Sequence, residues 1–155
     1  MAKFQDLEEY RKLILGHRVD RDTENLPQTA DGSLFTITGG RVLLTLIYGE
    51  VTTVIQSQAN NCLLKLNPTA TGASQDLCAV LNITADPVGE IYTISGTVGD
   101  AMRSDLLIGA GGLTAAPLIL KPGIIELEAA ASNTGQVQWS AFWLPLDVGA
   151  DLAVT

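Results

Sequence analysis

After Ser33 the chain becomes a succession of short apolar or β-branched segments, and turn sequences separate them. Val, Ile, Thr and aromatic residues favour extended strands, whereas Gly, Pro, Asn and Asp favour the turns between strands. Nine segments of the chain have this character. They are LFTIT, RVLLTLIY, EVTTVIQ, NCLLKLN, QDLCAVLNIT, EIYTISGTV, PLILK, GIIELEAA and GQVQWSAFWLPL.

This spacing of strands predicts an all-β domain. Eight or nine short strands with turns between them are typical of a sandwich or a barrel. No helix of normal length fits between the strands, so neighbouring strands should run antiparallel. A length of 155 residues suits a single domain. We therefore expect an antiparallel β-sandwich over residues 31–155, preceded by an extended or partly helical arm over residues 1–30.

The amino-terminal arm differs in character from the strands. Residues 1–16 carry large apolar side chains at helical intervals and end at Gly16, which predicts a short amphipathic helix. A helix of this length is marginal in water unless it packs on something. The polar stretch that follows contains Pro27 and Gly32 and shows no period, which predicts an extended segment. The apolar residues of the expected helix are Phe4, Leu7, Tyr10, Leu13 and Ile14.

Two strands indicate where the apolar surfaces of the sandwich lie. The segment 42–48 is apolar on both faces and so needs cover on both, from the arm or from another subunit. In the segment 137–144, residues two apart share a face, which puts both tryptophans of the chain on one apolar face. We interpret these tryptophans as core or subunit-interface residues rather than as a ligand platform. The residues predicted to form the core or a subunit seam are Val42, Leu44, Leu46, Trp139 and Trp143.

Two further strand positions carry specific expectations. Gly49 interrupts the run from residue 42 to residue 55, and a bulge there would let the strand bend from one sheet to the other. In the segment 123–128, Glu126 and Glu128 alternate with apolar residues. This alternation predicts a strand with one wet face that carries both glutamates.

The distribution of charge excludes two classes of partner. The net charge is −8, and from Leu26 onward the chain has four basic and eleven acidic residues. Such a body repels phosphate backbones and anionic membranes, so we expect neither nucleic acid nor a membrane as a partner. Charged residues make up only 17% of the chain, and this low share hints at surface buried between subunits. The sequence shows no signal peptide and no membrane-spanning run, which predicts synthesis in the cytoplasm.

Residues suited to catalysis or metal binding are sparse. Hydrolytic triads need a base, and the single histidine, His17, lies in the polar arm. His17, Cys62 and Cys78 are too scattered for a zinc site, and the cysteine spacing fits neither a redox motif nor a disulfide scaffold. The glycine-rich tract 105–116 lacks the Lys-Ser/Thr of a phosphate-binding loop, which predicts a plain loop. We therefore expect no catalytic residue, metal or cofactor, and interpret the cysteines as buried thiols.

Two stretches of the sequence resemble a known group of proteins. They are LFTITGGRVLLTLIYGEVTTVIQSQANNCLLKLNPT, residues 34–69, and KPGIIELEAAASNTGQVQWSAFWLPLDVGA, residues 121–150. In their pattern of strands and turns they resemble the jelly-roll capsid decoration, or cement, proteins encoded near the capsid genes of tailed bacteriophages. The resemblance covers residues 30–150. It implies a jelly-roll β-sandwich that forms a homotrimer on the outer surface of the phage head.

The resemblance also implies a function and its partners. Such a trimer sits at three-fold positions between hexamers of the major capsid protein and clamps them against the pressure of packaged DNA. The chain would then be a non-enzymatic virion protein, synthesised in the host cytoplasm. The five apolar arm residues would bind the capsid or a neighbouring copy, ordering on contact, with three arms adding avidity. The five strand residues named above would form the core or the trimer seam.

A binding module is the alternative function. Jelly rolls also serve as lectins and as carbohydrate- or receptor-binding heads of phage particles. That function needs an exposed aromatic side chain or a polar cluster in a loop. The loops at residues 69–75 and 99–116 contain no aromatic residue. An enzyme, as a third class, would need the base that the strands lack.

Overall fold

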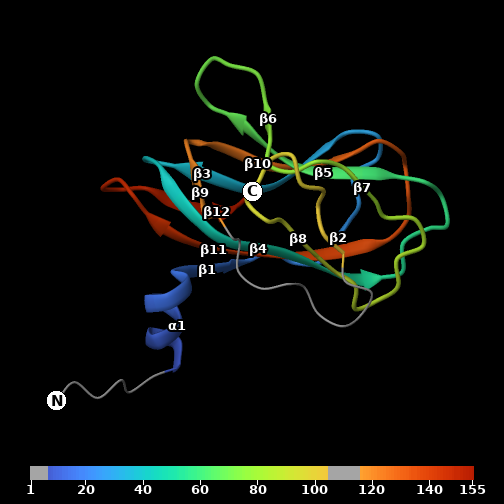
Figure 1. The fold of residues 1–155 in the computed structure, drawn as a ribbon, viewed down its shortest axis with the longest axis horizontal. Coiled ribbons are helices and arrows are strands. Elements are labelled where there is room, and N and C mark those ends of the chain that lie inside the picture. The colour runs from blue at the N-terminus through green and yellow to red at the C-terminus, as the bar shows by residue number, and fades with distance from the viewer. Residues whose placement is uncertain (1–6, 105–115) are drawn as a thin grey trace.

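The computed structural model describes residues 7–104 and 116–155 as one short helix and twelve strands. The helix α1 comes first, and the strands follow it along the chain (Figure 1). The bounds are α1 (Leu7–Leu15), β1 (His17–Asp20), β2 (Glu24–Asn25), β3 (Asp31–Thr38), β4 (Val42–Thr53), β5 (Asn61–Pro68), β6 (Gln75–Asp76), β7 (Leu81–Asn82), β8 (Ile91–Thr93), β9 (Leu118–Leu120), β10 (Gly123–Ala129), β11 (Gln136–Pro145) and β12 (Asp151–Val154).

The strands form two sheets that face each other. Sheet I has the order β1-β11-β4-β8, with β2 paired to β11 and β9 paired to β4. Sheet II has the order β12-β3-β10-β5-β6, with β7 paired to β5. Every pairing between these named strands is antiparallel. The predicted all-β antiparallel sandwich with a short amino-terminal helix is confirmed, and the jelly roll in particular stays a prediction.

Long strands that follow one another in the chain lie in opposite sheets. The chain runs from β3 in sheet II to β4 in sheet I and back to β5 in sheet II. It repeats this exchange from β10 to β11 to β12. Each of these strands turns apolar side chains toward the facing sheet, so the two sheets bury one shared core. The largest fully buried side chains of the described residues include Trp139, Tyr92, Phe35, Ile37, Leu64 and Ile125.

The longest strand, β4, has a bulge where the sequence suggests none. The pairing of β11 with β4 skips Thr45, since Phe142 pairs with Leu46 and Trp143 with Leu44. The extra residue reverses the alternation of the strand, so Leu44 points into the core while Leu46 is only half-buried on the outer face. Leu46 therefore lies outside the core, and of its two predicted positions, core or subunit seam, the seam stays a prediction.

Gly49 does not bend β4 from one sheet to the other. It lies within β4, which continues in sheet I from Val42 to Thr53, and it pairs with Trp139 of β11. A Cβ atom on Gly49 would lie 2.8 Å from the indole ring of Trp139. The glycine therefore makes room for a core tryptophan, which corrects the prediction of a bulge at this position.

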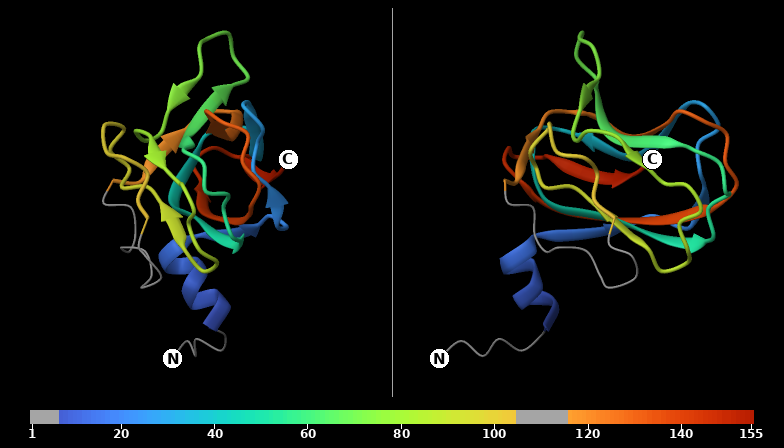
Figure 2. Two further views of the ribbon diagram at one scale, coloured as in Figure 1. Left: turned by 90° about the vertical axis from the view of Figure 1, so that its right-hand side faces the viewer. Right: turned by 45° about the vertical axis from the view of Figure 1, so that its right-hand side comes forward.

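The second half of the predicted arm belongs to the sandwich. Strand β1 pairs with β11 over four residues, and β2 pairs with the other end of β11. Residues 17–25 therefore form the edge of sheet I rather than a free extended segment. The helix α1, by contrast, projects from the body, as both views of Figure 2 show.

Candidate functional site

The helix α1 presents apolar side chains to solvent. No residue of α1 is buried, and Leu7 and Leu13 keep 89% and 67% of their surface exposed. Tyr10 and Ile14 are each more than half exposed. Their spacing places all four on one side of the helix. The structure thus brings together four of the five predicted arm residues, and Phe4 lies outside the described residues.

The junction between α1 and β1 depends on Gly16. Its φ of +89° is left-handed, and its N–H donates to the carbonyl oxygen of Lys12 at 3.0 Å, which closes the last turn of the helix. A Cβ atom on Gly16 would lie 2.1 Å from the carbonyl oxygen of Trp143. The hydroxyl of Thr45, the bulged residue of β4, lies within hydrogen-bonding distance of the Leu15 carbonyl. The helix therefore leaves the sheet at a position fixed by close backbone contacts.

Side chains on the outer face of sheet I hold β1 against β11. The carboxylate of Asp20 accepts hydrogen bonds from the Ser140 hydroxyl at 2.6 Å and from Nε of Arg18 at 2.7 Å. Burial alone would raise the pKa of Asp20, but these two hydrogen bonds hold it below its usual value. The guanidinium of Arg18 also lies over the ring of Phe142, 5.7 Å from its centroid. These contacts anchor the strand that carries α1.

The predicted core or seam residues separate into two groups. Val42, Leu44, Trp139 and Trp143 belong to the hydrophobic core between the sheets, and the two tryptophans keep only 2% and 7% of their surface exposed. Of the two alternatives, they take the core position within one subunit. Leu46 lies on the outer face of sheet I, where Phe142 is its cross-strand partner. It is the one residue of the set that another subunit could contact.

The outer face of sheet II carries a charged cluster around Lys65. Its Nζ lies 2.5 Å from Asp31 Oδ2 and 3.1 Å from Glu128 Oε2. Burial works to lower the pKa of Lys65, but the two carboxylates raise it above its usual value. Glu126 is only 6% exposed and accepts a hydrogen bond from Asn67 at 3.3 Å. The predicted wet face is therefore wrong for Glu126, because the β5 side chains beside it cover it.

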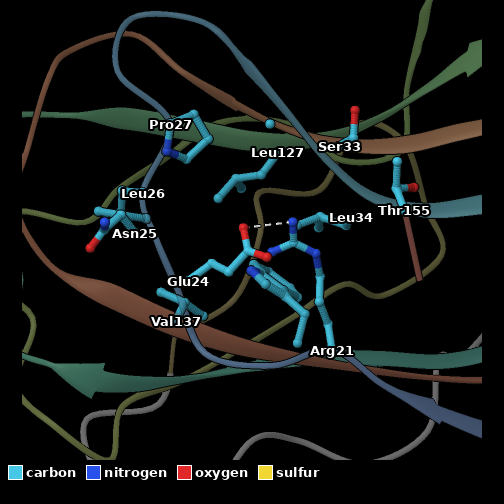
Figure 3. Close-up of a pocket in the computed structure, with 12 residues that line it drawn as sticks. Arg21, Glu24, Asn25, Leu26, Pro27, Ser33, Leu34, Leu127, Val137 and Thr155 are labelled. Carbon is cyan, nitrogen blue, oxygen red and sulfur yellow. Dashed lines mark ion pairs between the residues drawn. The ribbon is translucent and has the colours of Figure 1, made fainter.

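A cavity of about 250 Å³ opens where the chain passes from β2 to β3. Arg21 and Glu24 form an ion pair in it, with 2.8 Å between Nη2 and Oε2 (Figure 3). The sequence interpretation missed this site because it treated the polar stretch after Gly16 as an extended segment of the arm, separate from the sandwich. The spacing of the two charges, three residues apart, was the available signal. The apolar residues that line the cavity are Leu26, Pro27, Leu34, Leu127, Val137 and Trp139.

The two cysteines are free and buried, as predicted. Burial raises the pKa of the Cys62 thiol to about 12, and burial also raises the pKa of Cys78. The Cys78 sulfur accepts a hydrogen bond from the backbone N–H of Leu64 at 3.3 Å. Both thiols therefore stay protonated at neutral pH and act as small core residues.

The described residues contain neither a cluster suited to a metal ion nor a helix suited to crossing a membrane. Within residues 7–104 and 116–155, no three His, Cys, Asp or Glu side chains gather as they would around a metal ion. No helix in the described part of the chain is long and apolar enough to cross a membrane. The predicted loop 105–116 falls outside the described residues except for Ala116.

The chain matches no protein-family model, no curated protein and no solved structure.

Proposed function

We propose that the chain is a non-enzymatic structural protein of a tailed-phage virion. In this proposal it decorates the outer surface of the head as a homotrimer and stabilises the shell by binding the major capsid protein. The observation that carries the proposal is α1, a helix with an exposed apolar side that projects from the sandwich. Attachment is the function that such an element serves best.

The physical chemistry of α1 supports an attachment role. Nine residues form about two and a half turns, which are marginal in water without a surface to pack on. Exposure of Leu7, Leu13 and Ile14 is unfavourable until a partner covers them. Glu8 and Glu9 in the first turn and Lys12 in the last interact favourably with the helix dipole and add a small stabilisation to α1. The helix is thus suited to laying its apolar side into a groove of another protein.

The body of the chain supports the same proposal in two ways. The exchange of successive long strands between the sheets is compatible with the jelly roll that the resemblance implies. The outer face of sheet I also carries half-buried apolar residues, including Leu43 and Leu46 of β4. Strand β4 pairs with one side of β11, and β1, which follows α1, pairs with the other side. A seam between copies at this face would place three helices on one side of a trimer. Three weak helix contacts would then act together on one shell.

Sedimentation with phage heads tests the proposal. Heads are assembled from the major capsid protein encoded in the same genome, mixed with the purified chain and pelleted. We expect the full chain to pellet with the heads and Leu13→Asp to bind at least about tenfold more weakly, since a charge would lie in the buried contact. Val148→Asp is the matched control, because Val148 is fully exposed in the turn before β12. It should bind as the unchanged chain does.

The outcomes separate the possible functions. No pelleting of the full chain would contradict the decoration function and favour the binding-module alternative. Pelleting that Leu13→Asp and Val148→Asp weaken equally would leave decoration in place and contradict the role of α1. The distinction matters because the sandwich faces, rather than the helix, would then hold the shell.

A further inference from the structure

An amine and two carboxylates meet on the outer face of sheet II. They come from three neighbouring strands, since β10 lies between β3 and β5 (Figure 1). Asp31 on β3 is the direct cross-strand partner of Glu128 on β10, and Lys65 on β5 contacts both carboxylates. A long side chain can reach a residue diagonally opposite on the next strand. The pairing of the three strands therefore fixes this group of side chains.

The geometry of the group suits a covalent bond between Lys65 and Asp31. The Nζ atom of Lys65 lies 2.5 Å from Oδ2 of Asp31. The carboxyl carbon is bonded to that oxygen, so the amine already lies close to the carbon that it would attack. Reacting groups held about 3–3.5 Å apart behave as if their concentration were about 10⁵–10⁸ M. Such an arrangement offsets the unfavourable condensation of an amine with a carboxylic acid in water.

The surroundings shield the amine more than the carboxylates. Lys65 is only 8% exposed, whereas the side chains of Asp31 and Glu128 keep 41% and 45% of their surface exposed. Leu63 of β5, the direct cross-strand partner of Glu128, is also buried. The amine is therefore held in one place, while the exposed carboxylates allow a product water molecule to leave.

We propose that Lys65 and Asp31 form an intramolecular isopeptide bond. The Lys65 ammonium first transfers a proton to Asp31, which converts the ion pair into an amine and a carboxylic acid. The Nζ lone pair then forms a bond to Cγ of Asp31. Glu128, with Oε2 3.1 Å from Nζ, accepts a proton from the nitrogen and passes it to the departing hydroxyl group. One amide and one water molecule replace the ion pair, and Glu128 ends as a carboxylate again.

The charges of the ion pair make the bond slow to form. Burial works to lower the pKa of Lys65, but the hydrogen bonds to Asp31 and Glu128 raise it above its usual value. The neutral amine, which is the nucleophile, is therefore a minor form at neutral pH. We expect the bond to accumulate in the folded chain with time.

The bond would link the two strands that flank β10. Backbone pairing joins β10 to β3 on one side and to β5 on the other. A covalent link between residues 31 and 65 would also restrict the unfolded chain, as a disulfide does. It would stabilise the sandwich independently of capsid attachment through α1.

Mass spectrometry of the full chain tests the proposal. The purified chain is kept at neutral pH, and samples taken over several weeks are denatured and weighed intact. We expect a species that is lighter than the sequence by one water molecule, and its share should rise with time. Digestion should release a pair of peptides in which Lys65 is joined to Asp31. A mass that stays at the value of the sequence, or a link from Lys65 to Glu128 instead, would overturn the proposal.

A lysine variant separates the isopeptide bond from another loss of water. Asp31 precedes Gly32, and an Asp-Gly pair can lose water by closing a succinimide ring. Lys65→Arg keeps the charge but cannot form the amide, so the loss of water should disappear. Lys121→Arg, at an exposed lysine after β9, is the matched control and should keep it. An equal loss of water in Lys65→Arg would contradict the proposal, and peptide mapping of the unchanged chain makes the same distinction if this variant fails to fold.

A second variant tests the part that Glu128 plays. Glu128→Gln removes the proton acceptor and leaves both reacting groups in place, so it should slow the loss of water at least about tenfold. Glu50→Gln, at an exposed glutamate on β4, is the control and should leave the rate unchanged. An unaltered rate in Glu128→Gln would contradict the proton transfer through Glu128.

Discussion

Contacts at single residues decide how the core of this sandwich closes. Gly49 and Trp139 face each other across β4 and β11, and the indole occupies the space where any other residue would place its Cβ atom. A tryptophan at this position therefore requires a glycine on the neighbouring strand. The sequence shows both residues, but nothing in it indicates that they meet.

Gly49→Ala should destabilise the chain by about 1–3 kcal/mol, because its Cβ atom would lie 2.8 Å from the Trp139 ring and the packed core cannot move aside freely. Urea unfolding followed by tryptophan fluorescence measures the change. Gly99→Ala is the control, since a Cβ atom on Gly99 would have no neighbour within 4 Å. Equal loss of stability in the two variants would contradict the steric explanation.

The surface pair of Arg41 and Asp147 predicts a pH dependence. Asp147 accepts hydrogen bonds from Nε, Nη2 and the backbone N–H of Arg41 at 2.7–2.8 Å, and these hold the pKa of Asp147 well below its usual value. Since the pKa is lower in the folded chain, the pair stabilises the fold above about pH 4, and this contribution disappears as the pH falls. Asp147→Asn should therefore lower the Tm at neutral pH and make less difference below about pH 4.

Thermal unfolding across this pH range, with Asp151→Asn as a control on an exposed residue of β12, checks the prediction. The difference in Tm between Asp147→Asn and the unchanged chain should shrink as the pH falls. A difference that stays constant would show that the two charges do not interact in solution.

Elements that look alike in the sequence have different roles in the fold. The arm reads as one polar and helical unit, yet α1 projects while β1 and β2 complete the edge of sheet I. Pairing with β11 stabilises β1, and the apolar side of α1 has no equivalent contact. Removing α1 alone should therefore affect stability far less than removing α1 together with β1 and β2.

Deletion of residues 1–15 should change the Tm by less than about 3 °C, because α1 adds no buried residue to the core. Deletion of residues 1–25 should lower the Tm by more than about 10 °C, because it uncovers the edge of β11 and the ring of Phe142. Calorimetry of the two shortened chains measures both values. A large loss on the shorter deletion would mean that α1 packs on the body in solution.

The sequence predicts strands well where apolar alternation and turn residues coincide. The segments NCLLKLN and GIIELEAA correspond closely to β5 and β10. Prediction was weaker where pairing depends on distant partners. QDLCAVLNIT forms only the two-residue strands β6 and β7, and β1 forms from a polar segment because β11 is beside it. The bulge at Thr45 likewise depends on tertiary contacts that local propensity does not include.

The candidate sites show the same division. The apolar side of α1 could be predicted from spacing alone, since a helix repeats every 3.6 residues. The cavity could not, because it joins Arg21 and Glu24 to Leu34, Leu127 and Trp139 across four strands and two sheets. A site assembled from both layers of a sandwich appears only once the strand order is known.

The whole molecule presents two unlike outer faces. Sheet II carries the charged cluster around Lys65, whereas sheet I carries the anchor of α1 and the half-buried Leu46. A low share of charged residues is consistent with further surface being covered between copies. The asymmetry favours sheet I as the side where copies meet.

Light scattering behind a sizing column should therefore give three times the subunit mass of 16.4 kDa. The chain lacking residues 1–15 should give a trimer as well, because the proposed seam lies in the body. Leu46→Asp should lower the mass to that of a monomer, whereas Val148→Asp should not. A monomer for the full chain would remove the trimer from the proposal.

Cys62 and Cys78 are the only cysteines in the sequence, and both are buried as protonated thiols. The native surface therefore offers nothing to maleimide or iodoacetamide reagents. Leu13→Cys would place one reactive sulfur on α1 without removal of either native cysteine. A single fluorophore per subunit would then let copies be counted on individual particles by stepwise photobleaching. The buried thiols thus make the chain a ready carrier for site-specific labels.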